Sequence, residues 1–401
     1  MKNLVLSTKN GRWSYVNHMK ILVTGAKGFV GKNLIAELRN QKYEDIYEYD
    51  IDTDPALLDE YAKECDFVFH LAGVNRPKDT KEFMEGNFGF TSVLLEKLAK
   101  HSNKAPVLIT SSIQAALSNP YGESKKAGED LLFEYGKKTG AMVYVYRLPN
   151  VFGKWCRPNY NSAVATFCNN IACDLPIMVN DPSVMMHLVY IDDVVEEFIR
   201  ALKGEATALA DCEFNGTPDG IDISGFKGVP VVHERSLGEI ADIITSFKET
   251  RKNLSIPDMS DKLVSKLYST YLSYLPTDQF AYDLEMHVDN RGSFTEFIRN
   301  EDRGQVSVNI SKPGITKGQH WHHSKNEKFL VVKGEGLIRF RRIDSDEIIE
   351  YRVSGDKLQV VDIPTGYTHS IINVGEEDMV TVMWANEPFN PDKPDTFYLE
   401  V

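Results

Sequence analysis

The feature that most constrains the fold is a glycine-rich turn, Gly25-Ala-Lys-Gly-Phe-Val-Gly31, between a strand-like and a helix-like segment. The apolar run Ile21–Thr24 precedes it, and a helical pattern follows over residues 31–39. In that setting glycines let the backbone approach a pyrophosphate, and the amino end of the helix faces its negative charge. The turn therefore predicts a dinucleotide site, with the following residues at the cofactor: Gly25, Lys27, Gly28, Phe29, Val30 and Gly31.

The pattern of strands and helices divides the chain in two. Between residues 19 and 275, short apolar strands alternate with helical segments such as 31–39 and 91–101, which is typical of a doubly wound, Rossmann-type parallel sheet. From about residue 280 to 401, strands and turns with little helical signal predict an all-β barrel or sandwich. Residues 1–18 are polar and unpatterned, so we expect a disordered extension or a misassigned start there.

Composition narrows the classes of function. With 45 Lys plus Arg against 58 Asp plus Glu, the formal charge of −13 gives no electrostatic reason to bind nucleic acid. No apolar stretch is long enough for a membrane helix, so no membrane insertion is expected. The five cysteines form no CxxC pair and are odd in number, which is typical of a reducing compartment. We expect a cytoplasmic enzyme whose partners are small molecules.

A second constellation predicts carbonyl chemistry. Tyr121 and Lys125 are four residues apart and share one face of a helix, and Ser111 and Ser112 end a preceding strand. An ammonium held near a phenol favours the phenolate, which lowers the phenol pKa and makes it a usable proton donor to a forming alkoxide. A serine hydroxyl can polarise the same carbonyl. We predict Tyr121 and Lys125 as catalytic residues, with a strand-end serine beside them.

The choice of nicotinamide stays open at this level. Asp50 stands where an acid would bind a free ribose diol, whereas Lys27 in the glycine turn could meet a 2′-phosphate. We predict that Lys27 outweighs Asp50, which makes NADPH the working reductant and NADH the alternative.

Four side chains near the carboxyl end predict a metal site. His320 and His322 are two apart, so on a strand they point to one face while His323 points away. Glu327 lies on the next stretch, and His369 follows a Pro-Thr-Gly turn. Three imidazoles and one carboxylate suit one divalent metal, Zn²⁺ first, with Fe, Mn or Ni not excluded by ligand type.

The ordered landmarks of the first domain resemble those of extended short-chain dehydrogenases. They include the glycine turn, His70-Leu-Ala-Gly73, Tyr121-Gly-Glu-Ser-Lys125 and Arg147-Leu-Pro-Asn-Val-Phe-Gly153. The resemblance implies that Tyr121 donates the proton, that Lys125 contacts the nicotinamide ribose and that Ser112, with Ser111 as its substitute, binds the substrate oxygen. It also places further residues at the cofactor: Leu71, Ala72, Gly73, Lys125 and Arg147.

The residues after the strand-end serines bear on the reaction. Sugar dehydratases of this family usually carry an acidic pair there, whereas this chain has Ile113-Gln114. Neither side chain can act as an acid or base, which favours net carbonyl reduction over dehydration. A redox-neutral epimerase stays open.

The second domain resembles the cupins, double-stranded β-helix barrels. The motifs that carry the resemblance contain Gly314, His320, His322, Glu327 and Gly334, then Gly355, Pro364, Gly366, His369 and Asn373. It implies metal binding more firmly than any one reaction, and a metal that only stabilises the barrel is the alternative.

The order of motifs from residue 19 onward resembles that of a family of bifunctional capsular-polysaccharide enzymes. The resemblance rests on long strings such as FGKWCRPNYNS and GQVSVNISKPGITKG. It implies that the cupin epimerises C3 of a UDP-linked 4-keto-6-deoxy-N-acetyl sugar and that the reductase then reduces the C4 ketone with NADPH. The product would be UDP-2-acetamido-2,6-dideoxy-L-talose, a precursor of N-acetyl-L-fucosamine.

Some features of that reaction stay open from the sequence. Candidate bases for proton transfer at C3 are His323, Lys317 and Tyr367, among which the sequence does not choose. The family pattern also implies a homodimer. The alternative is a reductase, or a redox-neutral epimerase, whose cupin is only structural or sugar-binding.

Overall fold

The computed structural model describes residues 4–9, 12–214, 216 and 222–401. By its internal contacts the chain divides into two compact units, which are described separately. The first comprises residues 1–244 and 262–275, and the second comprises residues 245–261 and 276–401.

The first unit is built on a six-stranded parallel sheet in the order β10-β7-β6-β5-β3-β4. Strand order reverses next to β3, the strand that leads into the glycine turn, and such a switch point opens a crevice at the carboxyl ends of the strands. The strands are β3 (Ile21–Thr24), β4 (Ile46–Tyr49), β5 (Phe67–His70), β6 (Val107–Ser112), β7 (Val143–Leu148) and β10 (Phe226–Lys227).

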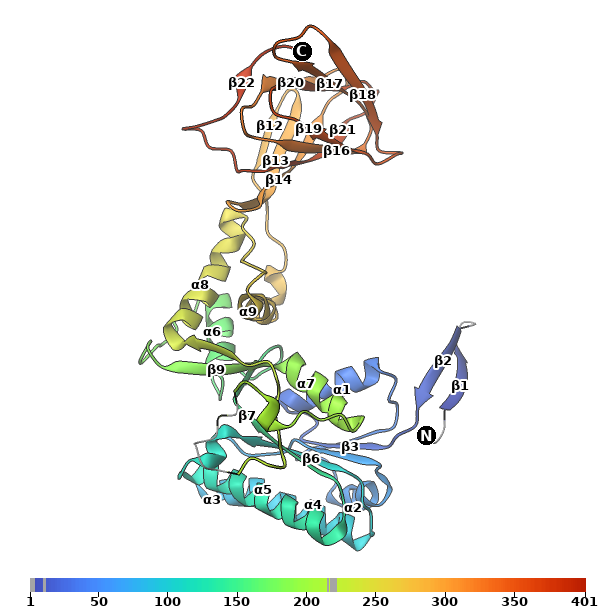
Figure 1. The fold of residues 1–401 in the computed structure, drawn as a ribbon, viewed down its shortest axis with the longest axis vertical. Coiled ribbons are helices and arrows are strands. Elements are labelled where there is room, and N and C mark those ends of the chain that lie inside the picture. Colours follow the sequence, from blue (N-terminus) through green and yellow to red (C-terminus); the bar gives the residue numbers. More distant parts are fainter. Residues whose placement is uncertain (1–3, 10–11, 215, 217–221) are drawn as a thin grey trace. The chain divides into compact units, whose positions relative to one another are not determined.

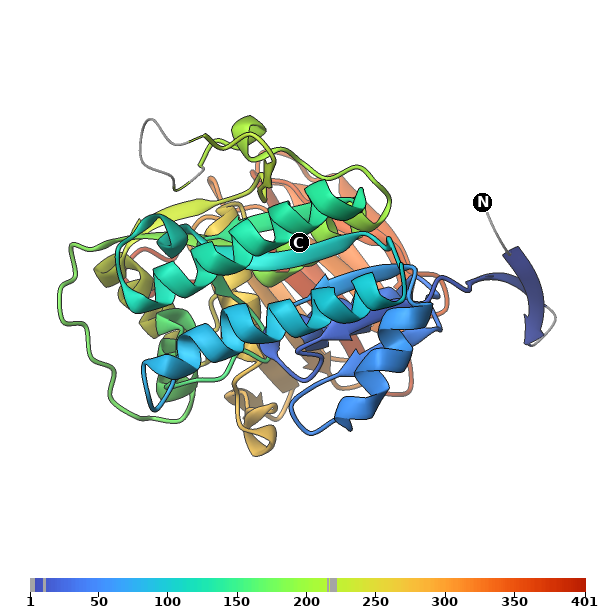
Figure 2. The ribbon, with the colours of Figure 1, turned by 90° about the horizontal axis from the view of Figure 1, so that it is seen from below.

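Helices cover both faces of this sheet. Successive residues of one strand face opposite sides, so Ile21 and Val23 join one buried cluster while Leu22 joins the other. The first cluster is completed by α1 (Phe29–Asn40) and α7 (Ile191–Leu202), and the second by α2 (Pro55–Glu64), α4 (Phe90–Lys100) and α5 (Pro120–Thr139), as Figure 1 shows. In the view from below, α4 and α5 lie side by side (Figure 2). Two-sided burial explains why these strands read as continuous apolar runs rather than alternating ones.

Smaller elements complete the first unit. A three-stranded sheet has the order β11-β9-β8, with β9–β8 parallel and β11–β9 antiparallel. The remaining elements are α3 (Lys81–Phe83), the π-helix η1 (Met84–Gly89), the 3₁₀-helices η2 (Ile113–Ala116) and η3 (Leu209–Asp211), β8 (Asn150–Phe152), α6 (Ala163–Ala172), β9 (Met185–Tyr190), β11 (His233–Ser236) and α9 (Lys262–Leu272).

The amino-terminal segment differs from the expectation of disorder. Strands β1 (Leu4–Lys9) and β2 (Arg12–Asn17) pair antiparallel, from Leu4 opposite Asn17 to Lys9 opposite Arg12. Both segments contain apolar and β-branched residues that favour strands, among them Val5 and Val16. Residues 1–3 and 10–11 of the predicted extension lie outside the described part of the chain.

The second unit is an antiparallel double sheet. One sheet has the order β12-β13-β14-β21-β16-β19 and the other β18-β17-β20-β15-β22. Both fold class predictions, a parallel α/β sheet followed by an all-β cupin-like domain, are confirmed. The strands are β12 (Met286–Asp289), β13 (Gly292–Asn300), β14 (Gly304–Ser311), β15 (Thr316–Trp321), β16 (Glu327–Lys333), β17 (Glu335–Arg342), β18 (Ile348–Ser354), β19 (Val360–Ile363), β20 (Tyr367–Asn373), β21 (Met379–Ala385) and β22 (Phe397–Tyr398).

Residues 245–261 belong to the second unit, although the sequence pattern placed them in the first. The boundary between the units falls within helix α8 (Leu237–Asn253). A second boundary follows residue 275, just before the short 3₁₀-helix η4 (Thr277–Gln279). The backbone of Leu254 accepts a hydrogen bond from Arg299, and Ile256 exchanges two hydrogen bonds with the Asn300 side chain. These contacts join segments more than 40 residues apart, so local periodicity could not predict them.

Candidate active site and metal centre

The glycine turn opens onto a cavity of about 720 Å³ in the first unit. Gly25 has φ +69°, and a Cβ there would lie 2.7 Å from the backbone nitrogen of Ala72, so only glycine fits between β3 and β5. Gly28 caps the amino end of α1. The cavity is bordered by nearly all of the predicted cofactor residues of this turn and of the segment after β5: Gly25, Lys27, Gly28, Phe29, Val30, Gly31, Leu71 and Gly73.

The predicted catalytic residues line the same cavity. Ser112 ends β6, and Tyr121 and Lys125 lie on the first two turns of α5. The side chain of Asn119 caps α5 by accepting a hydrogen bond from the amide of Gly122. The Lys125 ammonium is 5.8 Å from the centre of the Tyr121 ring and donates to the carbonyl oxygen of Thr110 at 3.3 Å. The helix and the strand end therefore bring the three side chains together, as their spacing predicted.

Burial decides the proton affinities at this site. It raises the pKa of Tyr121, and a hydrogen bond with Ser112 offsets only part of that shift. Burial also lowers the pKa of Lys125 to about 8, although the carboxylate of Glu129 acts in the other direction. The predicted lowering of the phenol pKa by the ammonium is therefore not found, because burial outweighs it. Lys125 instead loses its proton more easily than an ordinary lysine.

Arg147 and Ser111 both donate hydrogen bonds to Glu129, rather than to the cofactor or the substrate as predicted. The Arg147 guanidinium donates to both oxygens of Glu129, at 2.8 and 2.6 Å, and Ser111 donates to the same carboxylate at 2.6 Å. The side chains of Arg147 and Glu129 are 2% and 0% exposed. Arg147 does not line the cavity, so its assignment to the cofactor is not supported. Although Ser111 borders the cavity, its hydroxyl is occupied, which favours Ser112 as the serine of the site.

Two charged residues bear on the choice of cofactor: Asp50, which directly follows β4, and Lys27, which lies in the glycine turn after β3. The carboxylate of Asp50 accepts hydrogen bonds from the amides of Lys27 and Ile51, at 2.7 and 2.8 Å. The ammonium of Lys27 pairs with Asp52, and both side chains are exposed. Lys27 borders the cavity, whereas Asp50 and Ala72 do not. The negative charge of Asp50 is thus held by the glycine turn itself.

A further part of the cavity wall was not predicted from the residues. It is formed by the segment after β8 and includes Trp155, Arg157, Tyr160 and Asn161. The Arg157 guanidinium lies 5.0 Å from the centre of the Tyr160 ring. These residues belong to the string FGKWCRPNYNS, which carries part of the family resemblance. Its cluster of a cation with two aromatic rings is the signal that could have identified a binding wall.

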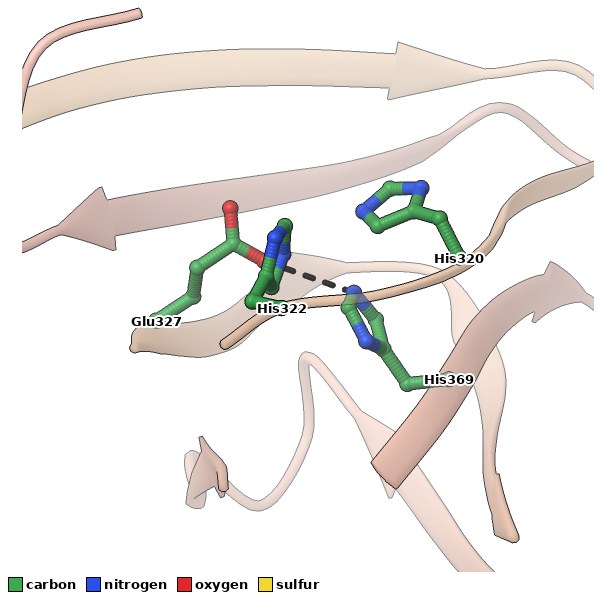
Figure 3. Close-up of side chains that lie close together, drawn as sticks. All are labelled: His320, His322, Glu327 and His369. Carbon is green, nitrogen blue, oxygen red and sulfur yellow. Dashed lines mark ion pairs between the residues drawn. The ribbon is translucent and has the colours of Figure 1, made fainter. Parts of the chain in front are cut away.

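In the second unit, the four predicted metal ligands converge. One ligand atom from each of His320, His322, Glu327 and His369 lies within 4.8 Å of the others. Figure 3 shows the four side chains directed toward one point. His320 and His369 are register partners on β15 and β20, His322 follows β15, and Glu327 opens β16.

The hydrogen bonding of this cluster fits a cation. The Nδ1–H of His322 donates to the carbonyl oxygen of Asp395 at 2.6 Å, which leaves Nε2 with its lone pair toward Glu327. Nε2 of His322, Nε2 of His369 and Oε2 of Glu327 are buried without a hydrogen-bond partner among the described residues. Burying such atoms without a partner is costly, and a metal ion would satisfy all of them at once.

The pKa shifts of His320 and Glu327 also favour a bound cation. Burial lowers the pKa of His320 to about 4, and the neighbouring imidazoles of His369 and His322 lower it further. Burial alone would raise the pKa of Glu327, but the imidazoles of His322 and His369, whose Nε2 atoms lie 3.5 and 3.4 Å from its Oε2, outweigh burial and hold that pKa well below its usual range. A neutral imidazole and an ionised carboxylate are the ligand forms that a divalent metal requires.

The three candidate bases differ in their placement. His323 packs its ring against Trp321 and Phe397, with centroids 4.5 and 5.0 Å away, so it points away from the cluster as predicted. The ammonium of Lys317 is held by Asn309 at 2.6 Å and by the carbonyl oxygens of residues 310 and 293. Tyr367 lies two residues before His369 on β20 and packs against the barrel core. Tyr367 shares a strand face with His369, and Lys317, opposite Ile371 across a bulge in β15, faces the same side but is already held by its hydrogen bonds.

Comparison with known proteins gives matches for both units. Residues 21–215 match the NAD dependent epimerase/dehydratase family, and residues 287–397 match the polysaccharide biosynthesis C-terminal domain. The chain is 44% identical over 383 residues to a UDP-2-acetamido-2,6-beta-L-arabino-hexul-4-ose reductase of Pseudomonas aeruginosa, covering 96% of this chain and 99% of that protein.

Solved structures give a similar result. The capsular polysaccharide assembling protein CapF from Staphylococcus aureus is 54% identical, with a TM-score of 0.87 over 96% of this chain and 100% of that one. A UDP-glucose 4-epimerase from Thermotoga maritima, at 18% identity and a TM-score of 0.51, shares the fold over 64% of this chain and 98% of that one. Among the described residues, no helix is both long and apolar enough to cross a lipid bilayer.

Proposed function

The chain belongs to the family of CapF and of UDP-2-acetamido-2,6-beta-L-arabino-hexul-4-ose reductase, and from this premise we propose that it is a bifunctional sugar-nucleotide enzyme. In this proposal the cupin unit epimerises C3 of a UDP-linked 4-keto-6-deoxy-N-acetyl-hexose. The first unit then reduces the C4 ketone with NADPH. The product is UDP-2-acetamido-2,6-dideoxy-L-talose, toward UDP-N-acetyl-L-fucosamine for capsular polysaccharide.

One observation carries the reductase half of the proposal. Ser112, Tyr121 and Lys125 border the same cavity as the glycine turn, and the acidic pair of a dehydratase is replaced by Ile113-Gln114. A bound nicotinamide would supply the hydride. The hydroxyl of Ser112 would orient the ketone oxygen, and Tyr121 would donate its proton to that oxygen as negative charge develops. Its raised pKa keeps the phenol protonated until then.

Lys125 completes that proton transfer. Its positive charge, 5.8 Å from the Tyr121 ring, would stabilise the phenolate left behind. The cavity wall formed by Trp155, Arg157 and Tyr160 would suit a nucleoside diphosphate, because it offers a cation to the phosphates and aromatic faces to the base. Reductive chemistry therefore needs no residue from outside this cavity.

The metal cluster supports the cupin half. His320, His322, Glu327 and His369 would hold one divalent cation, Zn²⁺ first, which could stabilise negative charge on a sugar oxygen. The C4 ketone acidifies the neighbouring C3 proton, so removal and return of that proton on the other face inverts the centre. We propose Tyr367 for one of these transfers, because it lies on the strand face of His369.

The test is to incubate the protein with the UDP-4-keto sugar and NADPH and to identify the product by NMR. Incubation in D₂O without NADPH should exchange the C3 proton. Reduction without any exchange would leave only the reductase and make the cupin structural or sugar-binding. Conversion of the sugar with no net NADPH consumption would instead identify a redox-neutral epimerase.

A further inference from the structure

Asp395 organises the turn that carries the metal ligand His322. Its carboxylate accepts hydrogen bonds from the backbone amides of residues 323, 324 and 325, at 3.0, 2.9 and 2.8 Å, and from the hydroxyl of Ser324 at 3.0 Å. Three consecutive amides therefore donate to one side chain 70 to 72 residues away. The turn leads from His322 directly to Glu327, so its shape sets the separation of two of the four cluster residues.

The main chain of the same residue orients the imidazole. The carbonyl oxygen of Asp395 accepts Nδ1–H of His322 at 2.6 Å. A neutral histidine that donates one ring N–H presents the other nitrogen as a lone pair, and in the neutral ring of His322 that nitrogen is the buried Nε2 that faces Glu327. His322 is 2% exposed, so water does not offer its ring an alternative partner.

The segment that contains Asp395 is also paired with the strand that carries His320. It runs into β22, where Tyr398 is opposite His320 and Phe397 is opposite Trp321. The amide of Leu399 then donates to the carbonyl oxygen of Gln319. The strand pairing of β22 with the strand of His320 thus holds Asp395 in place, and Asp395 in turn holds the turn that follows His322.

We propose that Asp395 is the positioning residue of the metal centre, setting the tautomer of His322 and fixing the turn of residues 323–325. This inference rests on the proposed function of the cluster as a metal site. Partners behind the ligands commonly change metal affinity about 10–100-fold when they are removed. Asp395 touches no reacting atom, and its effect would act through His322.

Two variants and a control separate positioning from simple stability. Asp395→Ala removes the four acceptor contacts of the carboxylate, whereas Asp395→Asn keeps one oxygen and replaces the other with a group that cannot accept. Asp392→Ala is the matched control, because Asp392 lies exposed in the same segment and its carboxylate makes no hydrogen bond with the described residues.

The experiment uses the full chain, stripped of metal and titrated with Zn²⁺ in competition with a chromophoric chelator. We expect Asp395→Ala to raise the Kd by about tenfold or more, Asp395→Asn to fall between it and the unmodified chain, and Asp392→Ala to leave the Kd unchanged. The thermal midpoint of each metal-free variant is measured in parallel. A lower midpoint with an unchanged Kd would make Asp395 a purely structural residue and overturn the inference.

The outcomes also separate this inference from the metal site itself. If the unmodified chain binds Zn²⁺ no better than His322→Ala does, the metal site fails and the role of Asp395 fails with it. If the unmodified chain binds Zn²⁺ through His322 and the Asp395 variants bind equally well, only the role of Asp395 fails. Should Asp395→Ala not fold, Asp395→Asn decides by the same comparison of Kd values.

Discussion

The buried pair of Glu129 and Arg147 gives a prediction that decides what Arg147 does. Both side chains are almost completely buried, joined by two short hydrogen bonds, and Ser111 donates to the same carboxylate. Glu129→Leu should destabilise the first unit by about 3–5 kcal/mol, because it leaves the guanidinium buried without a counter-charge. For a domain of this size each kcal/mol lowers the Tm by about 2–4 °C, so we expect a fall of roughly 6–20 °C.

The double variant should recover most of that loss. Replacing a buried ion pair with apolar side chains of similar volume is often neutral, so Glu129→Leu with Arg147→Met restores the balance. The hydroxyl of Ser111 then lacks its acceptor, which costs about 1 kcal/mol. The double variant should therefore unfold close to the unmodified chain and well above either single variant.

The assay is calorimetric unfolding of the full chain, followed by fluorescence titration of NADPH into the double variant. Two transitions are expected, and only the one of the first unit should move. If the double variant is stable but binds NADPH ten or more times more weakly, Arg147 contacts the cofactor, as the sequence resemblance implied. A loss below about 1 kcal/mol in Glu129→Leu would refute the reasoning from the buried pair.

Three further predictions concern the reductase site. Tyr121→Phe should reduce the rate on the order of 10² or more and leave cofactor affinity nearly intact, and wild-type NADPH consumption by this variant would remove Tyr121 as the proton donor. Because the pKa of Lys125 is about 8, kcat/KM should fall as pH rises through that value. The variant Lys125→Arg should keep its charge and show no such fall. Identical pH profiles for the two proteins would exclude Lys125 as the titrating group. Lys27→Ala should weaken the binding of NADPH about tenfold or more and that of NADH little, because a charge-assisted contact with the 2′-phosphate outweighs the exposed ion pair with Asp52. An equal loss of affinity for both cofactors would assign the ribose to Asp50.

Much of the site could be predicted from the sequence, because it depends on local periodicity. The glycine turn lies between a strand and a helix that adjacent residues specify, and Tyr121 and Lys125 share a face of α5 through the helical repeat alone. The alternation of a strand similarly separates His323 from His320 and His322. In each case the backbone geometry of one element fixes where the side chains point.

Other roles depend on contacts between distant segments. Ser111 and Ser112 are neighbours on β6 and look equivalent in the sequence, but Glu129 on α5 occupies the hydroxyl of Ser111. Arg147 stands among family landmarks, yet its charge is neutralised by a side chain 18 residues earlier. An ion pair is invisible in a sequence unless its partners share one element, because the fold alone brings them together.

Local patterns along the chain are therefore enough to predict the two fold classes and the residues that each strand, turn or helix presents together. Three findings needed the folded chain: the hydrogen bond of His322 to the carbonyl oxygen of Asp395, the place of residues 245–261 in the second unit, and the cavity wall after β8. Side-chain direction follows from backbone repeats of two or 3.6 residues, which a sequence displays. The partners of a side chain depend on loop closures over tens to hundreds of residues, and no local pattern encodes them.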